Sequence, residues 1–377
     1  MPYSSNEEDY PVQETTPFPE AQHGTQDRRT VPLVLKRSAI RSRKLTQHHR
    51  HKMAPSMAGQ ATNPLPATTD NRQTVSRYLG LQGPRGHRMK QPIAAMVVSM
   101  VLYKQIGTEF KAKYEELGHL GEGGFGAVYH GYRKEDFLPV AIKHIALDQV
   151  IHTPVCLNGQ IVQFPLEVLL LYKVGGEPGS HGQNAAVTLL DHYELDQELI
   201  LVMERPAPCM DLFDYVKESG GSLQEHEAKI LLRQLVEAML EIHGKGVSHG
   251  DIKFENLLVE TGSRAPRLRL IDFGCGSFLE EGLCTRFFGT ADYTPPEWYA
   301  RGCHSAATTT VWQLGVLLYG ALTGYFPFSS TMGTLFKRPV IKGELSQYCQ
   351  NFLRSCLAKN PKSRPTLASL LLHPWLR

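Results

Sequence analysis

The segment VSHGDIKFENLL, residues 247–258, decides the fold. It places Asp251, Lys253 two residues later and Asn256 five residues after the aspartate on a stretch without helix or strand periodicity. An acid, a base and an amide at this spacing suit chemistry on a phosphate. Asp251 can accept the proton of an attacking hydroxyl, and Lys253 can stabilise the transferred phosphoryl group. Gly250 precedes the acid, which raises the question of what holds the segment in place.

Upstream, the glycine-rich segment GEGGFGAV at 121–128 lies within a predicted strand pair rather than between a strand and a helix. Glycines let a hairpin tip approach phosphates and offer them backbone N–H groups. Lys143 follows on a predicted strand over 138–145, where apolar neighbours favour a side chain that points into a cleft. Glu167 stands on an otherwise apolar helix face. Since a buried carboxylate needs a partner, we expect it to pair with Lys143.

Downstream, Asp272-Phe273-Gly274 follows a predicted strand over 268–271. A carboxylate at a strand end, beside a flexible glycine, suits Mg²⁺, which prefers oxygen ligands and keeps several waters. Asn256 can supply a second oxygen. A glycine-rich turn or this tripeptide alone is common, but the ordered set at these spacings indicates one phosphotransfer site.

The hydrophobic pattern divides this part of the chain in two. It predicts a sheet with one helix over 114–204, and an Asn-Gly pair at 158–159 predicts a hairpin. Afterwards the pattern is helical. Ser222 with Glu225 predicts a capping box, and 307–322 is apolar nearly all round, as in a buried central helix. The expected fold class is α+β, with a β-rich lobe, a helical lobe and a ligand cleft between them.

Residues 1–103 differ from the rest in composition. They are rich in Pro, Ser, Thr, Gln and His, and residues 1–90 carry 14 Lys and Arg against 7 Asp and Glu. Such a segment cannot bury enough surface to offset chain entropy, so we expect a basic, mostly disordered N-terminal extension. A basic arm can bind acidic partners, but a solvated arm without a direct nucleic-acid role is the expectation. The apolar run 92–103 is shorter than the roughly 20 residues of a membrane span, so no span is expected.

All seven cysteines lie after residue 155, and no CxxC spacing occurs. An odd number without that spacing indicates neither a disulfide framework nor a zinc site. No signal peptide is recognisable at the start of the sequence. We therefore expect reduced thiols in a protein of the cytoplasm or the nucleus.

The ordered motifs resemble the signature of eukaryotic protein kinases over roughly 106–377. Pro-Pro-Glu at 295–297 stands where that family carries its A-P-E segment, and Arg364 is the usual partner of that glutamate. Lys253, two residues after the catalytic aspartate, matches the serine/threonine-kinase pattern. The resemblance implies a monomeric enzyme that uses ATP and Mg²⁺.

The same resemblance implies the architecture and the nucleotide site. The fold would be bilobal, with an N-lobe over 106–204 and a C-lobe over 205–377. The implied catalytic residues are Asp251, Lys253, Asn256, Lys143 and Glu167, and the implied metal ligands are Asn256 and Asp272. The implied ATP contacts are Leu120, Gly121, Gly123, Gly126, Val128, Ala141, Lys143, Met203, Glu204 and Pro206.

The finer resemblance is to the Pim family of serine/threonine kinases. It is carried by LPVAIKH, PLEVLLLYKV, ERPAPCMDLFDYV, PPEW and VWQLGVLLY. In that family the segment between the lobes reads E-R-P, which here is Glu204-Arg205-Pro206 after a gatekeeper Met203. Because Pro206 has no N–H, adenine is expected to lose one of its two usual hydrogen bonds there. The carbonyl of Glu204 can still accept the other.

Pim kinases prefer peptides with arginine upstream of the phosphorylated serine or threonine. The resemblance implies that Asp211, Asp214 and Glu255 pair with those arginines, and a solvated acidic rim is the plainer alternative. Relatives carry acids where this chain has Arg286 and Phe288. We therefore expect a less strict demand for arginine.

Most kinases carry an arginine at the position of Gly250, where it binds a phosphorylated residue of the activation loop. Gly250 cannot do so, and Thr310 replaces the aspartate that usually anchors the catalytic loop. We expect activity without activation-loop phosphate, as the Pim resemblance implies, and a less ordered catalytic loop. A pseudokinase scaffold and a binding module based on the basic extension are the alternatives. The P-P-E segment argues against a small-molecule kinase.

Overall fold

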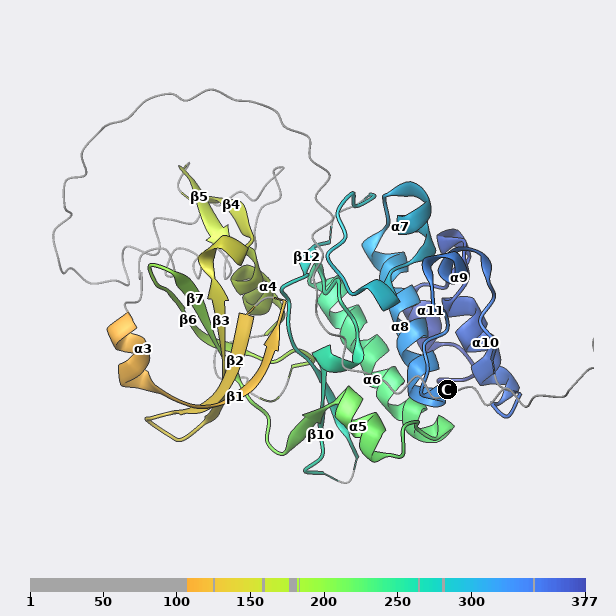
Figure 1. The fold of residues 1–377 in the computed structure, drawn as a ribbon, viewed down its shortest axis with the longest axis horizontal. Coiled ribbons are helices and arrows are strands. Elements are labelled where there is room, and N and C mark those ends of the chain that lie inside the picture. Colours follow the sequence, from red (N-terminus) through yellow and green to blue (C-terminus); the bar gives the residue numbers. More distant parts are fainter. Residues whose placement is uncertain are drawn as a thin grey trace, which may run out of the picture. The chain divides into compact units, whose positions relative to one another are not determined.

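In this computed structural model, residues 107–377 are described apart from 125, 158–159, 176–181, 183, 264, 280–281 and 342. The expected N-terminal extension, its apolar run and the turn residues 158–159 therefore lie outside the described residues. The strands gather on one side of the described part and most helices on the other (Figure 1). This arrangement confirms the expected β-rich N-lobe and helical C-lobe.

A five-stranded antiparallel sheet forms the N-lobe and confirms the predicted strands. In spatial order its strands are β1 (Tyr114–Gly123), β2 (Gly126–Arg133), β3 (Pro139–Ala146), β7 (Glu198–Glu204) and β6 (Leu189–Glu194). A separate hairpin pairs β4 (His152–Leu157) with β5 (Gln160–Pro165), as the sequence predicted. Helix α4 (Leu166–Val174) starts directly after this hairpin, and α3 (Gly107–Lys113) packs on β1 and β6.

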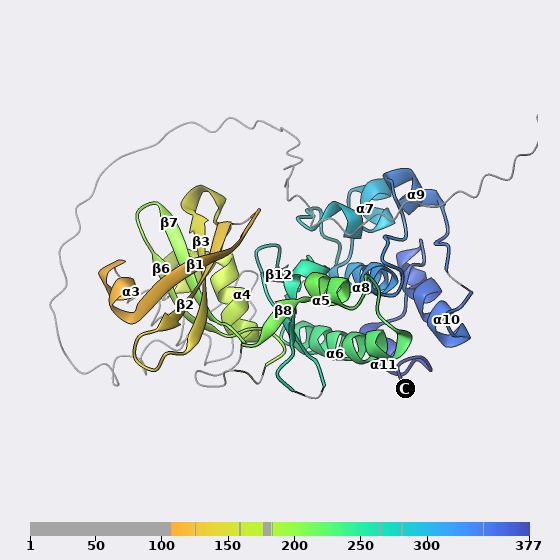
Figure 2. The same cartoon turned by 60° about the horizontal axis from the view of Figure 1, so that its bottom comes forward.

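The C-lobe is built on two long helices, α6 (Glu225–Gly244) and α8 (Ala306–Thr323), which pack on each other (Figure 2). Every residue of α8 from 309 to 323 is buried, which confirms the predicted central helix. The other helices are α5 (Leu212–Glu218), α7 (Pro296–Arg301), α9 (Thr331–Phe336), α10 (Gln347–Cys356) and α11 (Leu367–Leu371).

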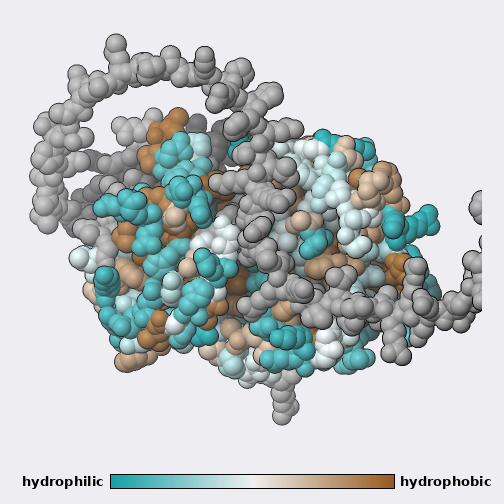
Figure 3. Space-filling model, in the orientation of Figure 1, coloured by the Kyte–Doolittle hydropathy of each residue, from teal (hydrophilic) through white to brown (hydrophobic). Residues whose placement is uncertain are grey.

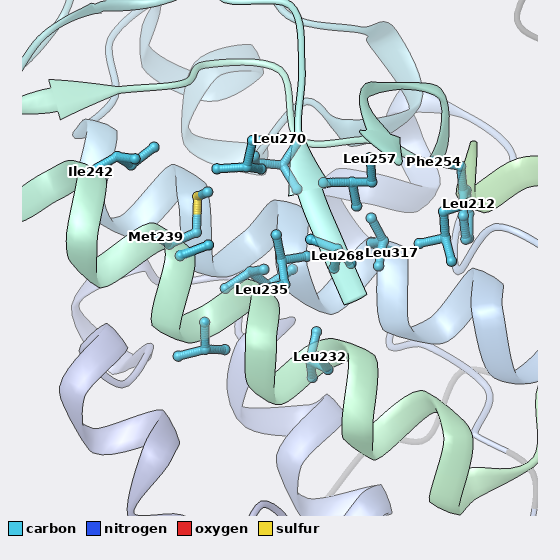
Figure 4. Close-up of a cluster of buried hydrophobic side chains, with 14 of the residues drawn as sticks. Leu212, Leu232, Leu235, Met239, Ile242, Phe254, Leu257, Leu268, Leu270 and Leu317 are labelled. Carbon is cyan, nitrogen blue, oxygen red and sulfur yellow. The ribbon is translucent and has the colours of Figure 1, made fainter. Parts of the chain in front are cut away.

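Short strands link this helical core to the active site. Strand β10 (Leu257–Glu260) pairs with β11 (Arg267–Leu270) and β8 (Cys209–Asp211), and β9 (Val247–Ser248) pairs with β12 (Ser277–Phe278). Leucines of β11 pack against the apolar face of α6 (Figure 4). The catalytic segment leaves β9 and enters β10, so both of its ends are fixed to the buried core.

The predicted capping box of Ser222 with Glu225 is wrong. Helix α6 is capped two residues later by Gln224, whose N–H donates to the carboxylate of Glu227 at 3.1 Å. Glu225 is engaged elsewhere, because it accepts from the indole N–H of Trp375 at 2.8 Å. Its carboxylate therefore ties α6 to the end of the chain instead of closing the helix start.

The described surface is mixed in character. Hydrophilic and hydrophobic residues are interspersed over the face drawn in Figure 3. The exposed large apolar residues include Ile161 in β5 and Phe336 in α9. All seven cysteines are free thiols. No helix among the described residues is long and apolar enough to cross a membrane.

Candidate active site

Lys143 lies at the centre of a buried ion-pair group. Its Nζ is 2.8 Å from Oε1 of Glu167 on α4 and 2.9 Å from Oδ1 of Asp272, which follows β11. The expected contact with Glu167 is present, whereas the contact with Asp272 was not predicted. This lysine thus joins three segments that are far apart in the sequence.

The charges of this group shift one another's pKa values. Burial alone would lower the pKa of Lys143, but Asp272 and Glu167 outweigh burial and raise it. Burial raises the pKa of Glu167, and Lys143 opposes that shift. Burial would also raise the pKa of Asp272, but Lys143 and the N–H of Gly274 lower it to about 2. Asp272 is therefore ionised at neutral pH, as a metal ligand must be.

The expected ATP-binding residues of the sheet share one face. Directly paired residues point to the same side of a sheet. Gly121 pairs with Val128, Val128 with Lys143, and Ala141 with Met203. Because Ala141 and Lys143 are two positions apart on β3, all five residues lie on the face that carries the lysine.

Two glycines pair at the tip of the glycine-rich hairpin. Gly123 and Gly126 pair across the end of β1 and β2. Gly126 has a φ of 121°, and a Cβ there would lie 1.8 Å from the carbonyl oxygen of His144. Only glycine fits this position. Leu120, just before the glycines, is exposed on β1. The lack of side chains at Gly123 and Gly126 suits the close approach of a phosphate.

The segment between the lobes has a side-chain contact that the sequence did not predict. Glu204, at the end of β7, is buried, and its carboxylate accepts the N–H of Thr188 at 2.9 Å. The same carboxylate forms an ion pair with Arg269 of β11, which is completely buried. Arg269 also lies 3.0 Å from Oε1 of Glu260. The side chain of Glu204 is therefore bound to the C-lobe sheet.

Backbone donors are scarce at this segment. The N–H of Glu204 donates to the carbonyl of Thr188 at 2.9 Å, and Pro206 has no N–H. The carbonyl of Pro206 accepts the thiol of Cys209 at 2.8 Å. A nucleotide base that docks here meets carbonyl acceptors but finds no N–H at position 206.

Asp251 is buried among its expected partners. Lys253 Nζ lies 2.7 Å from Oδ2 of Asp251, and the amide nitrogen of Asn256 donates to the carbonyl oxygen of Asp251 at 2.9 Å. The sequence analysis missed Thr290, whose N–H donates to Oδ1 of Asp251 at 2.8 Å and whose hydroxyl accepts from Lys253 at 3.0 Å. Burial would lower the pKa of Lys253, but Asp251 outweighs burial and raises it. An acid and a cation thus share one network.

Asn256 and Asp272 are adjacent and can act as metal ligands. The N–H of Ile271, the residue before Asp272, donates to the carbonyl of Asn256 at 3.0 Å. Because the amide nitrogen of Asn256 is used by Asp251, its amide oxygen is the atom suited to a metal. Within the described ranges, no cluster of three or more His, Cys, Asp or Glu could hold a metal ion alone. Two oxygen donors without a full cage fit Mg²⁺ that is held jointly with phosphates.

Gly250 packs directly against the backbone that follows Asp272. Its φ is 81°, and a Cβ there would lie 2.4 Å from the carbonyl oxygen of Cys275. A larger residue would force one of the two backbones to move. Thr310 does not reach this loop with its hydroxyl, which donates to the carbonyl of Ala306 in its own helix at 3.0 Å.

The three expected substrate-binding acids lie on adjoining elements. Asp211 ends β8, Asp214 is in α5 and Glu255 is in the 3₁₀ turn η2 (Phe254–Asn256). The carboxylate of Asp211 caps α5 by accepting the N–H of Asp214 at 2.8 Å. Burial raises the pKa of Asp292, and the charge of Glu255 adds to the shift. The structure thus gathers acids around the start of α5 and η2.

Comparison with known proteins identifies the family of this chain. The family described as Protein kinase domain matches residues 114–376. The chain belongs to the protein kinase family. It is similar to serine/threonine-protein kinase pim-2 of Danio rerio, with 39% identity over 279 residues, 73% of this chain and 89% of that protein. It is also similar to serine/threonine-protein kinase prk-2 of Caenorhabditis elegans, with 35% identity over 277 residues, 72% of this chain and 59% of that protein. The chain is therefore a Pim-like serine/threonine kinase.

A more distant relative matches this chain over a small part of its own length. The PAS domain-containing serine/threonine-protein kinase of Mus musculus is 31% identical over 272 residues, 71% of this chain and 19% of that protein.

In the present chain, Arg364 and Glu297 form the expected ion pair through two contacts of 2.7 Å. Arg364 also donates to the carbonyl of Thr308 at 3.0 Å, which fixes the start of α7 to α8.

Proposed function

We propose that this kinase transfers the γ-phosphate of ATP to serine or threonine in proteins with arginine upstream of the target. It does so without a phosphate on its activation segment. The observation that carries the proposal is the coexistence of two complete groups. Lys143 is paired with Glu167 and Asp272, while Asp251 is bonded to Lys253 and Thr290.

Each group has a distinct role in the transfer. Lys143, held by Glu167, binds the phosphates of ATP, and Asp272 with Asn256 would hold Mg²⁺, which neutralises charge on those phosphates when bound. Asp251 accepts the proton of the substrate hydroxyl. Lys253 stays charged beside it and stabilises the transferred phosphoryl group. Burial of these charges strengthens each contact relative to water.

Uncharged contacts hold the activation segment in the absence of phosphate. Cys284 and His304 exchange two backbone hydrogen bonds of 2.7 and 3.0 Å. The ring of His304 lies 3.0 Å from the carbonyl of Arg286 and packs against Phe287 at 5.3 Å. Thr290 then joins the segment to Asp251. These contacts support a segment that is ordered without an arginine clamp at Gly250.

The acids around η2 support the preference for arginine. A guanidinium that approaches Asp211, Asp214 and Glu255 would gain charge-assisted hydrogen bonds. Each of these acids is partly exposed, so each keeps access to a bound peptide.

Phosphate transfer from Mg-ATP by the 377-residue chain tests the proposal. Substrates are a serine peptide with upstream arginines and its alanine-substituted counterpart, and Asp251→Asn is the control. We expect transfer by phosphatase-treated wild type, a preference for the arginine peptide, and loss of transfer in the control. A shift in melting temperature with ATP but no transfer would instead make the protein a nucleotide-binding scaffold.

Two further results would remove only part of the proposal. Loss of activity after phosphatase treatment would end the claim of independence from phosphate. Equal rates on both peptides would end the claim of arginine selection. Asp214→Asn should reduce the preference between the two peptides without lowering the rate on the alanine peptide.

A further inference from the structure

Gln313 of α8 contacts the catalytic loop with both polar atoms of its side chain. Its amide nitrogen donates to the carbonyl of Gly250 at 3.0 Å, and its amide oxygen accepts the N–H of Ile252 at 3.4 Å. Gln313 is completely buried. Burial of a polar amide is unfavourable unless its hydrogen bonds are made, so these two contacts matter to where the side chain lies.

The two partners of Gln313 are the peptide groups on either side of Asp251. The carbonyl of Gly250 belongs to the peptide plane before Asp251, and the N–H of Ile252 belongs to the plane after it. Because peptide groups are planar, fixing both planes fixes φ and ψ of the residue between them. Gln313 contacts both planes, and the amide of Asn256 adds a hydrogen bond to the second plane at the carbonyl of Asp251. Gln313 therefore helps to set the direction in which the carboxylate of Asp251 leaves the backbone.

Gly250 makes this arrangement possible. Its φ of 81° turns the carbonyl toward α8, and a Cβ would lie 2.4 Å from the backbone of Cys275. Thr310, one turn earlier on α8, hydrogen bonds to its own helix and lies 3.4 Å from His243. The contact from the central helix to the loop thus comes from position 313 rather than position 310.

We infer that Gln313 is a positioning residue of the general base Asp251. This inference rests on the proposed function, in which Asp251 accepts the proton. The role needs one donor and one acceptor, which an amide supplies and which neither a carboxylate nor a thioether supplies. Misplacement of a catalytic group by about 1 Å is enough for a loss of roughly 100-fold.

The test compares Gln313→Met and Gln313→Leu in the 377-residue chain with the matched control Thr310→Ala. Methionine keeps the length of the side chain without its hydrogen bonds, and leucine lacks both the donor to Gly250 and the acceptor for Ile252. We expect kcat to fall roughly 10- to 100-fold in both Gln313 variants, with the KM for ATP and the ATP-induced shift in melting temperature unchanged. In Thr310→Ala we expect kcat within about threefold of wild type, as for a bond that stays within its own helix.

A kcat of Gln313→Leu within about twofold of wild type would overturn the inference, since that variant lacks both the donor and the acceptor. A parallel rise in the KM for ATP, or loss of the ATP-induced shift in both Gln313 variants, would also overturn it in favour of a general packing role. Absence of transfer by the wild type would instead overturn the proposed function. The two failures are therefore distinguishable within one assay.

Discussion

The ion-pair group around Lys143 and the catalytic loop around Asp251 are held in different ways. Around Lys143, opposite charges hold one another across β3, α4 and the segment after β11. The backbone of the Asp251 loop is instead held by the neutral amide of Gln313 and by Gly250, which packs closely against the backbone of Cys275. Charge acts over a distance and tolerates small shifts, whereas hydrogen bonds and close packing depend on exact placement of the backbone. This kinase retains the charges expected to meet the nucleotide and uses neutral groups to support its base.

The largest expected effect is at the charged group. Lys143→Met leaves the carboxylates of Glu167 and Asp272 buried side by side and removes the cation for the phosphates. Breaking a buried pair costs about 3–5 kcal/mol, and we expect kcat to fall by at least about 100-fold, as for other electrostatic contacts at reacting groups. Peptide kinase assays and thermal melts measure both. Lys134→Met is the matched control, because Lys134 forms an exposed pair with Glu115, worth about 0–1 kcal/mol.

Gly250→Ala disturbs the catalytic loop, which neutral groups hold in place. The substitution meets a left-handed backbone and a carbonyl oxygen at 2.4 Å, so we expect a loss of about 2 kcal/mol and a roughly tenfold lower kcat. Gly244→Ala is the matched control, since nothing lies within 4 Å of its Cβ position. In α6 that change should stabilise the protein by up to about 1 kcal/mol. Equal melting temperatures for the two variants would contradict the packing argument.

Acidification compares the two lobes through one partly buried histidine in each. Burial lowers the pKa of His192 on β6 and of His243 on α6 to about 4 from 6.5. Between these values the unfolded chain binds protons that the folded protein does not bind. Stability therefore falls as pH decreases from 6.5 toward 4, by up to about 1.4 kcal/mol per pH unit for each histidine.

Melting temperatures between pH 7.5 and 5 check this prediction. His243→Leu and His192→Leu should each flatten the pH dependence, and the double variant should flatten it further. His226→Gln, at an exposed position of α6, serves as the control and should keep the wild-type slope. A wild-type slope in the double variant would show that other groups carry the acid sensitivity.

The smallest expected effect is that of Thr290→Ala. This variant loses the hydroxyl that accepts from Lys253 at 3.0 Å but keeps the N–H that donates to Asp251 at 2.8 Å. One neutral acceptor facing a cation contributes about 1 kcal/mol, so we expect a three- to tenfold lower kcat. Steady-state kinetics at saturating ATP measure it. A loss of kcat as large as that in Lys143→Met would mean that the group around Lys143 and the loop around Asp251 do not act separately.

The charged group could be predicted from the sequence because its chemistry is carried by residue type and order. Lys143 on an apolar strand and Glu167 on an apolar helix each need a buried partner, and the contact is present. The strands of the N-lobe and the buried helix α8 likewise follow from hydrophobic periodicity. The structure confirms these elements.

The support of the loop could not be predicted, because it depends on backbone geometry and on a neutral side chain. Gln313 sits inside an apolar helix with no partner near it in the sequence, and Thr290 belongs to a segment without periodicity. The false capping box at Ser222 has the same origin. Glu225 has a competing contact with Trp375, 150 positions away, and local patterns carry no signal of such distant partners.

Glu204 has a mechanical consequence for movement between the lobes. Its main chain pairs with Val140 in the N-lobe sheet, while its side chain binds Arg269 in the C-lobe sheet. The segment before β6 is also bound to β11, since the N–H of Val187 donates to the carbonyl of Leu270 at 3.0 Å. Two separate N-lobe segments are thus bound to β11. Opening of the cleft between the lobes must therefore bend the N-lobe sheet itself. The N-lobe is not free to rotate as a rigid body about a single strand.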